Sequence, residues 1–463
     1  MTGFAAVVLA AGEGTRMKSC KPKVLHEICG VPMLSYVIDA ARAAGAEKII
    51  VVIGSDSDKV VKLFKDEPIK FVLQAEQKGT GHALMQAKDL ASDYPLTVVL
   101  YGDMPLIKAE SITGMVSDHE KNKASATVMT CTIDDPTGYG RIIRAGNRIA
   151  AIREQRDATT QEINIREVNS GLYCFDTEAV FSALEQVKDD NQQGEYYLTD
   201  VVEILTREGK AVFAYETKDP DEISGVNDRC QLAKVQLAMQ KRLINRLMRE
   251  GVTFINPDAS VVERNVRIGR DTVIYPGVYL EGNTSIGENC TIIGTSRIKD
   301  SKIGNDVEIV MSQILESNIE DDVKIGPFAN LRPGCNICKG AKLGDFIEIK
   351  NSQIGEGTKV PHLSYVGDAD IGKKTNVGAG VIFVNYDGYK KHRTTVEDGV
   401  FIGCNSNLIA PVKLESGSYI AAGSTVTDDV PEDSLAIARS RQVNKPDWVK
   451  KFKEKTRGGD SQK

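Results

Sequence analysis

A short stretch near the start of the chain combines the residue types that bind phosphate groups. It reads VVLAAGEGTRMKSCKPK. Glycines and a threonine stand near several cations, among them Arg16, Lys21 and Lys23. Glycines after a strand let the backbone approach a phosphate closely, and the amides of the loop donate to its oxygens. The stretch lacks the third glycine of a dinucleotide-binding turn, because Met17 stands there, and it lacks the Gly-Lys-Ser/Thr ending of a P-loop. We expect it to hold a polyphosphate; the alternative is a solvated basic loop.

The composition indicates a folded protein of two or three domains. Of the 463 residues, 26% are charged and 41% are hydrophobic. The formal net charge of -6 argues against general binding to nucleic acid or to an anionic membrane, so local clusters must hold any anionic ligand. The sequence has neither a secretory leader pattern nor a long apolar segment, and we therefore expect a cytoplasmic protein.

The nine cysteines are odd in number, which fits free thiols better than a disulfide framework. Cys335 and Cys338 form one CxxC pair, but no second Cys or His pair lies at a zinc-like spacing. We expect both to be ordinary residues of a regular coil, with no metal.

The first half of the chain alternates between buried strands and helices. Short β-branched runs that end in turn residues span 4–12, 48–54 and 95–103, and helical spacing marks 33–45 and 81–91. This alternation predicts a mostly parallel sheet that is covered on both faces. Ligands of such sheets bind beyond the carboxyl ends of the strands, where the motifs LAAGEGTRM and LYGD lie.

A long helix is predicted over residues 229–250, which contain neither glycine nor proline. Its apolar residues recur every three or four positions, at Leu232, Val235, Met239, Leu243 and Leu247. Asn227 or Asp228 is expected to cap its start, and Gly251 to end it. We interpret the helix as a spacer between domains; the alternative is a helix internal to the first domain.

After Gly251 the apolar pattern takes a period of six. Aliphatic residues recur at this spacing in three series, which are Ile268, Ile274, Leu280, Ile286, Ile292 and Ile298, then Ile319, Ile325, Leu331, Ile337, Leu343 and Ile349, then Ile402, Leu408, Leu414, Ile420 and Val426. A parallel β-helix of hexapeptide repeats explains this period, because each coil has three short faces and stacks one aliphatic column along each inner edge. Between Val384 and Val400 the repeat gives way to the polar stretch NYDGYKKHRTTVEDG, and such an excursion often serves binding.

Several motifs, in the same order, resemble one enzyme family over nearly the whole chain. They are LAAGEGTRM, KPKVL, QAEQKGTGHA, YGDMPL, DDPTGYGRI, VNSG, GEYYLTD and GVND. The chain resembles the bacterial bifunctional enzymes that combine N-acetylglucosamine-1-phosphate uridylyltransferase with glucosamine-1-phosphate N-acetyltransferase. The resemblance implies a Rossmann-like nucleotidyltransferase domain at 1–229, a helical linker at 230–250, and a left-handed parallel β-helix acetyltransferase domain with a C-terminal tail at 251–463.

The resemblance also implies the reactions. Acetyl-CoA would acetylate glucosamine 1-phosphate, and the resulting N-acetylglucosamine 1-phosphate would then attack UTP and release pyrophosphate. The product, UDP-N-acetylglucosamine, is a precursor of peptidoglycan and lipopolysaccharide.

For the uridylyltransferase, the resemblance implies a nucleotide and sugar site with two ligands of Mg²⁺. The residues expected there are Leu9, Ala10, Ala11, Gly12, Arg16, Lys23, Gln74, Gly79, Thr80, Tyr101, Gly102, Asp103, Gly140, Glu154, Asn169 and Asn227. Asp103 and Asn227 are implied to bind Mg²⁺, and Lys23 to act in catalysis by neutralising the phosphates. Since both reactants are anions, catalysis depends on positioning and charge neutralisation, and Mg²⁺ needs few protein oxygens. Taken alone, Asp103 could be a turn cap and Asn227 a helix cap.

For the acetyltransferase, the resemblance implies His362, in the motif PHLSYVGD, as the general base. The residues expected around the sugar phosphate are Arg332, Lys350, Tyr365, Asn376 and Lys391, and those around acetyl-CoA are Ala379, Asn385, Tyr386, Cys404, Ala422 and Arg439. A lone histidine is usually a solvated surface residue, but its setting beside Tyr365 and a loop rich in Asn and Lys favours catalysis. Cys404 stands where some relatives have serine, which matters only if the hydroxyl contacts the cofactor.

Two other functions stay open on the sequence. A single-activity sugar-1-phosphate nucleotidyltransferase with a regulatory β-helix would not need the set around His362, and a non-catalytic protein would not need Lys23 and Asp103. We expect a homotrimer assembled through the β-helix, with small-molecule substrates and neither a nucleic-acid nor a membrane partner. The tail from Arg439 holds nine basic and three acidic residues and the only tryptophan, Trp448. It is either solvated or reaches toward the CoA phosphates of a neighbouring subunit.

Overall fold

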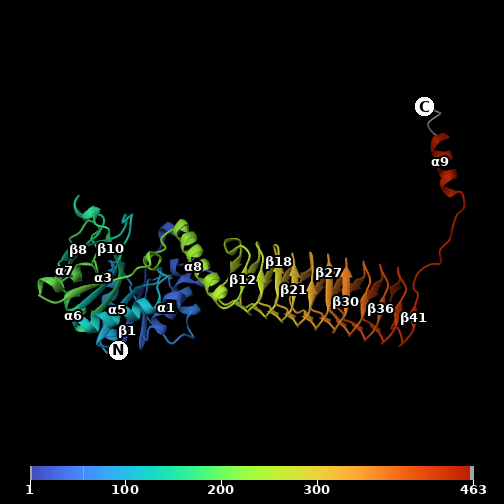
Figure 1. Ribbon diagram of the computed structural model, residues 1–463, viewed down its shortest axis with the longest axis horizontal. Helices are drawn as coiled ribbons and strands as arrows, with labels where there is room; N and C mark the ends of the chain where they lie inside the picture. Colours follow the sequence, from blue (N-terminus) through green and yellow to red (C-terminus); the bar gives the residue numbers. More distant parts are fainter. Residues whose placement is uncertain (1–2, 56, 459–463) are drawn as a thin grey trace. The chain divides into compact units, whose positions relative to one another are not determined.

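The computed structural model describes residues 3–55 and 57–458, and its contacts group the chain into two units (Figure 1). The first unit comprises Met1–Arg246 with Val262–Arg264, and the second comprises Leu247–Val261 with Asn265–Lys463. The division falls near the end of the predicted long helix.

A sheet of nine strands forms the centre of the first unit. Seven of them lie in the order β11 (Val212–Glu216), β7 (Ala126–Thr132), β10 (Glu167–Asp176), β6 (Leu96–Tyr101), β1 (Phe4–Ala10), β4 (Lys48–Ile53) and β5 (Lys70–Leu73). As predicted, β1 is parallel to both β4 and β6. The sheet is mixed, because β10 runs antiparallel to β6 and β7 and pairs with the hairpin of β8 (Arg141–Ala145) and β9 (Arg148–Arg153).

Helices cover both faces of this sheet, which explains the unbroken apolar strands. One face packs against α1 (Met33–Ala43) and α5 (Ala109–Asn122), in a core that includes Ala6 and Val8 of β1. The opposite core includes Val7 of β1 together with residues of the helices α3 (Thr80–Met85), α4 (Lys88–Ala91), α6 (Thr177–Leu184) and α7 (Asp200–Arg207). Successive side chains of β1 therefore pack against helices on opposite faces of the sheet.

The helix predicted over 81–91 is in fact two short helices, α3 and α4, which break at Gln86 and Ala87. The side-chain amide of Gln86 donates to the carbonyl oxygen of His82 at 3.1 Å. The backbone N–H of Gln86 instead donates to Ala83, one residue closer than in an α-helix. This competition for the His82 carbonyl coincides with the break.

The long helix forms as α8 (Arg229–Arg249), within one residue of the prediction. Asp228 caps its start, since its Oδ1 accepts from the backbone N–H of Gln231 at 2.8 Å. Gly251 follows its end with φ of 101°, in the left-handed region that glycine tolerates. The residues of its apolar stripe that are buried in a core of the first unit are Val235, Met239 and Leu243. Most of α8 thus belongs to the first unit.

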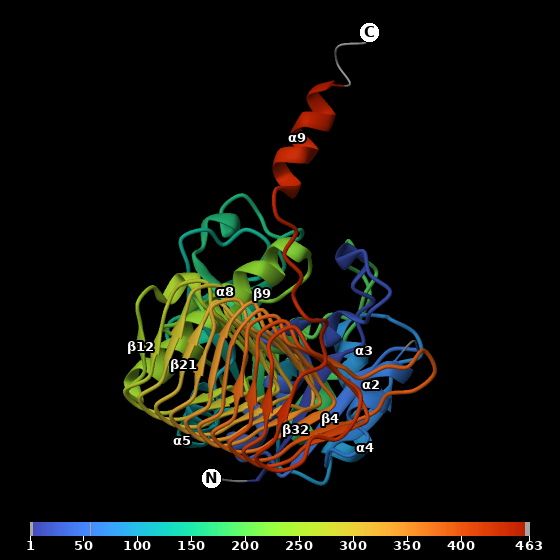
Figure 2. The ribbon, with the colours of Figure 1, turned by 90° about the vertical axis from the view of Figure 1, so that its right-hand side faces the viewer.

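The second unit is a left-handed parallel β-helix of three sheets, which confirms the fold predicted from the six-residue period. Figure 2 shows its coils nearly end-on. Each sheet takes every third strand, so neighbouring strands belong to successive coils. The first predicted aliphatic residues, Ile268, Ile274 and Leu280, are buried on three consecutive strands, which are β14 (Arg267–Ile268), β15 (Val273–Ile274) and β16 (Tyr279–Glu281).

The interruption predicted between Val384 and Val400 is shorter in the structure. It spans only 385–393, because β35 (Thr394–Val396) already resumes the repeat and pairs in parallel with β32 (Ala369–Ile371). Within this loop Asp387 accepts hydrogen bonds from the backbone N–H of Lys390 and from the ring of His392, which lower its pKa to about 2. These contacts hold the loop in a defined conformation.

All nine cysteines are free, and Cys335 is buried in its coil. Among residues 3–55 and 57–458, no group of three or more His, Cys, Asp or Glu side chains could hold a metal ion. In that same part of the chain, no helix is both long enough and apolar enough to cross a membrane.

Candidate active sites

Most residues expected to hold the nucleotide line one cavity of about 320 Å³ at the carboxyl ends of β1 and β6. Those residues are Leu9, Ala10, Ala11, Gly12, Lys23, Gln74, Gly79, Thr80, Tyr101, Asp103 and Asn227. Strands β1 and β6 pair with Leu9 opposite Tyr101, and the N–H of Gly102 donates to the carbonyl of Leu9 at 3.0 Å. The loops after the two strands therefore begin side by side, as expected at the edge of a parallel sheet.

Two glycines at or next to this cavity leave little room for a side chain. Gly79 has φ of 103°, and a Cβ there would lie 2.7 Å from the carbonyl oxygen of Tyr196. A Cβ on Gly102 would lie 3.2 Å from side-chain atoms of Ala10, Val24 and Leu34. Position 79 therefore needs glycine, whereas a side chain at position 102 would require its neighbours to shift by a few tenths of an ångström.

Lys23 joins the two candidate metal ligands. Its ammonium forms an ion pair with the carboxylate of Asp103 and donates to Oδ1 of Asn227 at 3.2 Å. Asp103 follows β6 and Asn227 precedes α8, so the two oxygens converge on one cation from distant parts of the chain. A carboxylate and an amide oxygen are ligands that suit Mg²⁺, whose remaining positions would go to phosphate or water oxygens.

The residues that the resemblance places around the sugar, which are Tyr101, Gly140, Glu154 and Asn169, lie near one another. The N–H of Asn169 donates to the carbonyl of Gly140 at 2.9 Å. A Cβ on Gly140 would be 3.5 Å from Oε1 of Glu154, and one on Gly171 would be 2.9 Å from the Tyr101 ring. Burial, chiefly, raises the pKa of Glu154. This carboxyl lines a second cavity, of about 420 Å³, rather than the cavity around Lys23.

Two cations of the loop, Arg16 and Lys18, line neither the Lys23 cavity nor the cavity next to it. Arg16 lies in a short 3₁₀ helix (Thr15–Met17) and is exposed. A further cavity of about 720 Å³ beside the same loop is lined by Lys21, Lys23 and Lys59 among others. Cations thus gather next to the nucleotide cavity without Arg16.

In the second unit, three cations expected around the sugar phosphate lie near one another, two at the ends of neighbouring strands and one in the loop 385–393. Arg332 follows β25 (Asn330–Leu331) and Lys350 ends β28 (Glu348–Lys350), and these strands are neighbours. Lys391, in the loop, approaches Lys350, and their contact and repulsion lower the pKa of Lys350. Such crowding of like charges is typical of an anion site.

The amide and hydroxyl groups near these cations form one cluster around Asp368. Its carboxylate accepts from the side-chain amides of Asn351 at 2.6 Å and Asn385 at 2.5 Å. Nδ2 of Asn385 also lies 3.4 Å from the Tyr365 hydroxyl. Asn385, expected near acetyl-CoA, is therefore a neighbour of Tyr365, expected near the sugar phosphate. Tyr386 pairs with Lys391 across the base of the loop.

The residues expected around acetyl-CoA follow His362 along one edge of the β-helix. His362 ends β30 (Lys359–His362), whose first residue pairs with Asn376 of β33 (Asn376–Val377). The register continues through β36 (Phe401–Ile402) and β39 (Tyr419–Ile420), so equivalent positions recur on successive coils. The residues at those positions are His362, Ala379, Cys404 and Ala422, and Arg439 lies beside Gly423. An extended cofactor could lie along such a row.

Comparison with known proteins covers both units. A family model described as a MobA-like NTP transferase domain matches residues 6–196, and one described as bacterial transferase hexapeptide (six repeats) matches 265–300 and 393–428. The bifunctional protein GlmU of Brevibacillus brevis is 49% identical over 458 residues, covering 98% of this chain and 99% of its own. That of Listeria welshimeri is 50% identical and covers 96% of this chain and 98% of its own, and that of Acetivibrio thermocellus is 48% identical and covers 96% of each.

The chain belongs to the bifunctional GlmU family. It is an enzyme with two activities, a nucleotidyltransferase in the first unit and an acyltransferase of the hexapeptide class in the second. Because the relatives match through both units, the match favours two activities over a single nucleotidyltransferase with a regulatory β-helix.

Two residues that were not predicted from the sequence also line the cavities of the first unit. Tyr197 lies beside Glu154 in the 420 Å³ cavity, and its buried hydroxyl has no hydrogen-bond partner within the described part of the chain. A buried hydroxyl without a protein partner has to be satisfied by water, by an ion or by a bound ligand. Gln77 lines the Lys23 cavity, and its side-chain amide donates to the carbonyl of Ala11 at 2.7 Å. Tyr197 lies in the motif GEYYLTD and Gln77 in the motif QAEQKGTGHA, so the motifs could have identified both as site residues.

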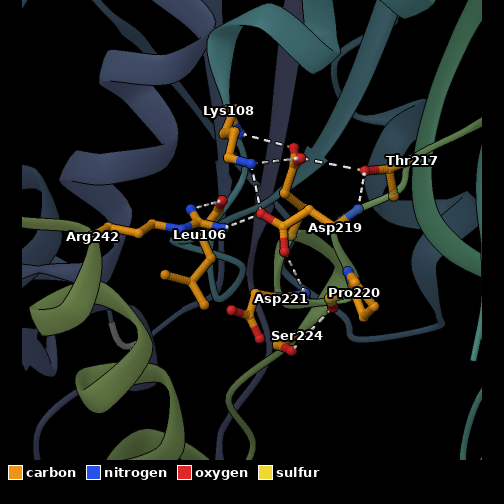
Figure 3. A network of polar contacts seen from close by, with 9 residues as sticks. Leu106, Lys108, Thr217, Asp219, Pro220, Asp221, Ser224 and Arg242 are labelled. Carbon is orange, nitrogen blue, oxygen red and sulfur yellow. Dashed lines mark hydrogen bonds and ion pairs between the residues drawn. The ribbon is translucent and has the colours of Figure 1, made fainter. Parts of the chain in front are cut away.

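A partly buried network of ion pairs and hydrogen bonds braces the segment that leads to Asn227 (Figure 3). Lys108 bonds the carboxylate of Asp219 at 2.5 Å and lies 3.4 Å from that of Glu222. Arg242 of α8 donates to Asp219 at 3.0 Å and to the carbonyl of Leu106 at 2.5 Å. Asp219 and Glu222 precede Asn227, whereas Leu106 and Lys108 follow Asp103. The network therefore ties together the two segments that carry the candidate metal ligands of this GlmU family member.

Proposed function

We propose that the two sites act in sequence to make a UDP-sugar for cell-wall synthesis. In the second unit, acetyl-CoA acetylates the amino group of glucosamine 1-phosphate. In the first unit, the N-acetylglucosamine 1-phosphate so formed attacks the α-phosphorus of UTP, and pyrophosphate leaves. The assignment of uridylyl transfer to the first unit rests on one observation. Asp103, Asn227 and Lys23 converge in the nucleotide cavity.

In uridylyl transfer the residues of the chain act by position and charge. The loop after β1 presents backbone amides to the phosphates, and Lys23 neutralises charge on them. Asp103 and Asn227 would hold Mg²⁺, which when bound supplies further positive charge against the phosphate oxygens. The attacking phosphate oxygen is already ionised near neutral pH, so the site needs no side-chain base.

In acetyl transfer the cations Arg332, Lys350 and Lys391 would hold the sugar phosphate and so present its amine to the cofactor. The neutral amine attacks the thioester carbonyl carbon, and the C–S bond breaks as CoA leaves. His362 takes one proton from the attacking nitrogen and returns one to the CoA thiolate. A backbone N–H is expected to stabilise the oxyanion of the tetrahedral intermediate.

We further propose that the enzyme is a cytoplasmic homotrimer assembled through the β-helix. UTP and acetyl-CoA are substrates of the cytoplasm. Flat faces of a triangular coil can pack around a threefold axis and create clefts lined by two subunits. The alternative in which the basic tail reaches the CoA phosphates of a neighbouring subunit belongs to this proposal. It is compatible with the exposure of residues 439–456, which include most of α9 (Trp448–Gly458), in the single chain.

A coupled assay tests the function. The purified full-length chain with glucosamine 1-phosphate, acetyl-CoA, UTP and Mg²⁺ should release CoA and pyrophosphate in equal amounts. Asp103→Ala should lower uridylyl transfer at least about a hundredfold, the scale of losing a key electrostatic group, and spare acetyl transfer. His362→Ala should lower acetyl transfer by about a hundred- to ten-thousandfold and spare uridylyl transfer.

The control for these variants is Asp93→Ala, which removes an exposed carboxylate of the first unit and should change neither reaction. Loss of both reactions in either variant, with the fold intact by circular dichroism, would contradict two independent sites.

A further inference from the structure

One carboxylate lies against the imidazole of His362. Asp345 ends β27 (Lys342–Asp345), His362 ends β30, and the two residues are paired in register on consecutive coils. Oδ1 of Asp345 lies 2.6 Å from Nδ1 of His362. The following equivalent positions are Ala379, Cys404 and Ala422, none of which is a carboxylate. The coil geometry thus places one acid directly behind the proposed base.

The contact determines which ring nitrogen carries hydrogen. The hydrogen bond from His362 is the largest of the causes that lower the pKa of Asp345. An ionised carboxylate has only acceptor sites, so the shared hydrogen must belong to Nδ1. The neutral imidazole then keeps its lone pair on Nε2, the nitrogen farther from Asp345, which is the atom that can accept a proton.

We propose that Asp345 is a positioning residue for acetyl transfer, which holds His362 with Nε2 unprotonated and stabilises the ring once it is protonated. This inference rests on the proposed role of His362. The proton moves from the attacking amine nitrogen to Nε2 as the N–C bond forms, and then to the CoA sulfur as the C–S bond breaks. Asp345 keeps its charge throughout and only accepts the Nδ1 hydrogen bond, as carboxylates do behind other histidine bases.

A purely structural role does not account for the pair. The side chains of His362 and Asp345 are 56% and 38% exposed, and exposed pairs add little to folding stability. Loss of a carboxylate that orients a functional histidine instead lowers activity, typically by about ten- to a hundredfold. The effect of Asp345 should therefore appear in the rate of acetyl transfer and not in the stability of the β-helix.

The test compares Asp345→Ala with Glu356→Ala in the full-length chain. Glu356 pairs with Lys373 at 3.4 Å in the same stretch of coils, and both are exposed, so it is a matched control. We expect Asp345→Ala to lower kcat of acetyl transfer about tenfold. KM for glucosamine 1-phosphate, uridylyl transfer and the Tm should stay unchanged, and Glu356→Ala should resemble the wild type. An unchanged kcat, or a loss seen only in KM or Tm, would overturn the inference.

Two further readouts separate positioning from other effects. In the His362→Ala background, Asp345→Ala should cause no additional loss, because Asp345 acts through the ring; a full additional tenfold loss would refute this. In ¹⁵N-histidine NMR spectra, the neutral His362 ring should carry hydrogen on Nδ1 in the wild type and shift toward the Nε2–H form in Asp345→Ala. If His362→Ala itself leaves acetyl transfer intact, the proposed function of that site fails, which is distinguishable from failure of the Asp345 role.

Discussion

The ammonium of Lys23 neutralises the carboxylate of Asp103 at the point where the two candidate metal ligands meet. The side chains of Lys23 and Asp103 are each 14% exposed, so neither charge is well solvated. Removing one partner of such a pair leaves the other as a poorly compensated charge. Lys23 therefore serves two anions, the carboxylate of Asp103 and the phosphates of the proposed nucleotide.

Replacing this cation should affect one reaction only. We expect Lys23→Ala to lower kcat/KM of uridylyl transfer at least about a hundredfold, because the phosphates lose a fixed positive charge. Acetyl transfer by the same protein should stay normal. Steady-state assays of both reactions check this, with Lys18→Ala, an exposed lysine of the same loop, as the control. Comparable losses in the two variants would show that only the general charge of the loop matters.

A second residue-scale effect concerns Asp200, which lines the 420 Å³ cavity with Glu154. Burial, reinforced by the charge of Glu203 and opposed by Arg153, raises the pKa of Asp200 to about 6. The folded state thus binds this proton more tightly than the unfolded state does. Stability contributed by the protonated form is lost as the pH rises from about 4 to about 6, and the ionised carboxylate is unfavourable at neutral pH.

We predict that Asp200→Asn raises the Tm of the first unit relative to wild type more at pH 7 than at pH 5. The amide keeps the shape of the protonated carboxyl and cannot ionise. Calorimetry at the two pH values measures the difference, and Asp66→Asn, at an exposed position, provides the control. A Tm difference that is the same at both pH values would contradict the raised pKa.

At the scale of elements, α8 contributes to the nucleotide site through side chains that never reach the cavity. Arg242 lies on α8 yet bonds Asp219 and the carbonyl of Leu106, on the two segments that carry the candidate metal ligands. The N–H of Val226 also donates to the carbonyl of Asp103 at 3.0 Å, which joins those segments directly. The separation of Asp103 and Asn227 therefore depends on how α8 packs.

Removal of the Arg242 side chain should loosen this arrangement. We expect Arg242→Ala to cost about 2 kcal/mol of stability, since it removes hydrogen bonds to a charged group and to a carbonyl. We also expect a several-fold increase in the Mg²⁺ concentration that gives half-maximal uridylyl transfer. Denaturant unfolding and Mg²⁺ titrations measure the two effects. Lys241→Ala, at the exposed neighbouring position of α8, should show neither; an unchanged Mg²⁺ dependence in Arg242→Ala would refute the link.

At the scale of the whole molecule, the β-helix carries an apolar ridge along one corner. This corner is occupied on successive coils by Met311, Phe328, Phe346 and Leu363, and these residues are 37–62% exposed. Each has a positive φ, which costs a residue with a side chain about 1 kcal/mol. In the last two coils of the ridge, Phe346 is the residue after Asp345, and Leu363 is the residue after His362. An exposed apolar ridge beside the second site is the surface that a trimer would cover.

We predict that the double change Phe328→Lys and Phe346→Lys converts the proposed trimer into smaller species. Two buried charges without partners would oppose association. Sedimentation of the full-length chain measures the assembly, and acetyl transfer should fall with it if a neighbouring subunit completes the site. Tyr279→Lys, which changes another exposed aromatic residue of the β-helix, is the control. A trimer that survives the double change would mean that another surface carries the assembly.

Patterns with a short period determined much of this protein from the sequence alone. The six-residue spacing of aliphatic residues predicted the β-helix, because each face of a coil takes about six residues and turns one aliphatic side chain toward the interior. The parallel core of β1, β4 and β6 followed from apolar runs between helices, and the ordered motifs predicted the family. The same local reasoning failed at Gln86, where a side chain competes for a backbone carbonyl that the helical period cannot reveal.

Contacts between distant positions were decided only by the tertiary structure. The meeting of Asp103 and Asn227 on Lys23 joins residues up to 204 positions apart, and it depends on which strands are neighbours and on how α8 packs. The contact of Asp345 with His362 spans 17 positions, a separation that brings two residues together only when one coil has that length. Motifs identify residue types, but strand order, coil length and helix packing determine which side chains share a site.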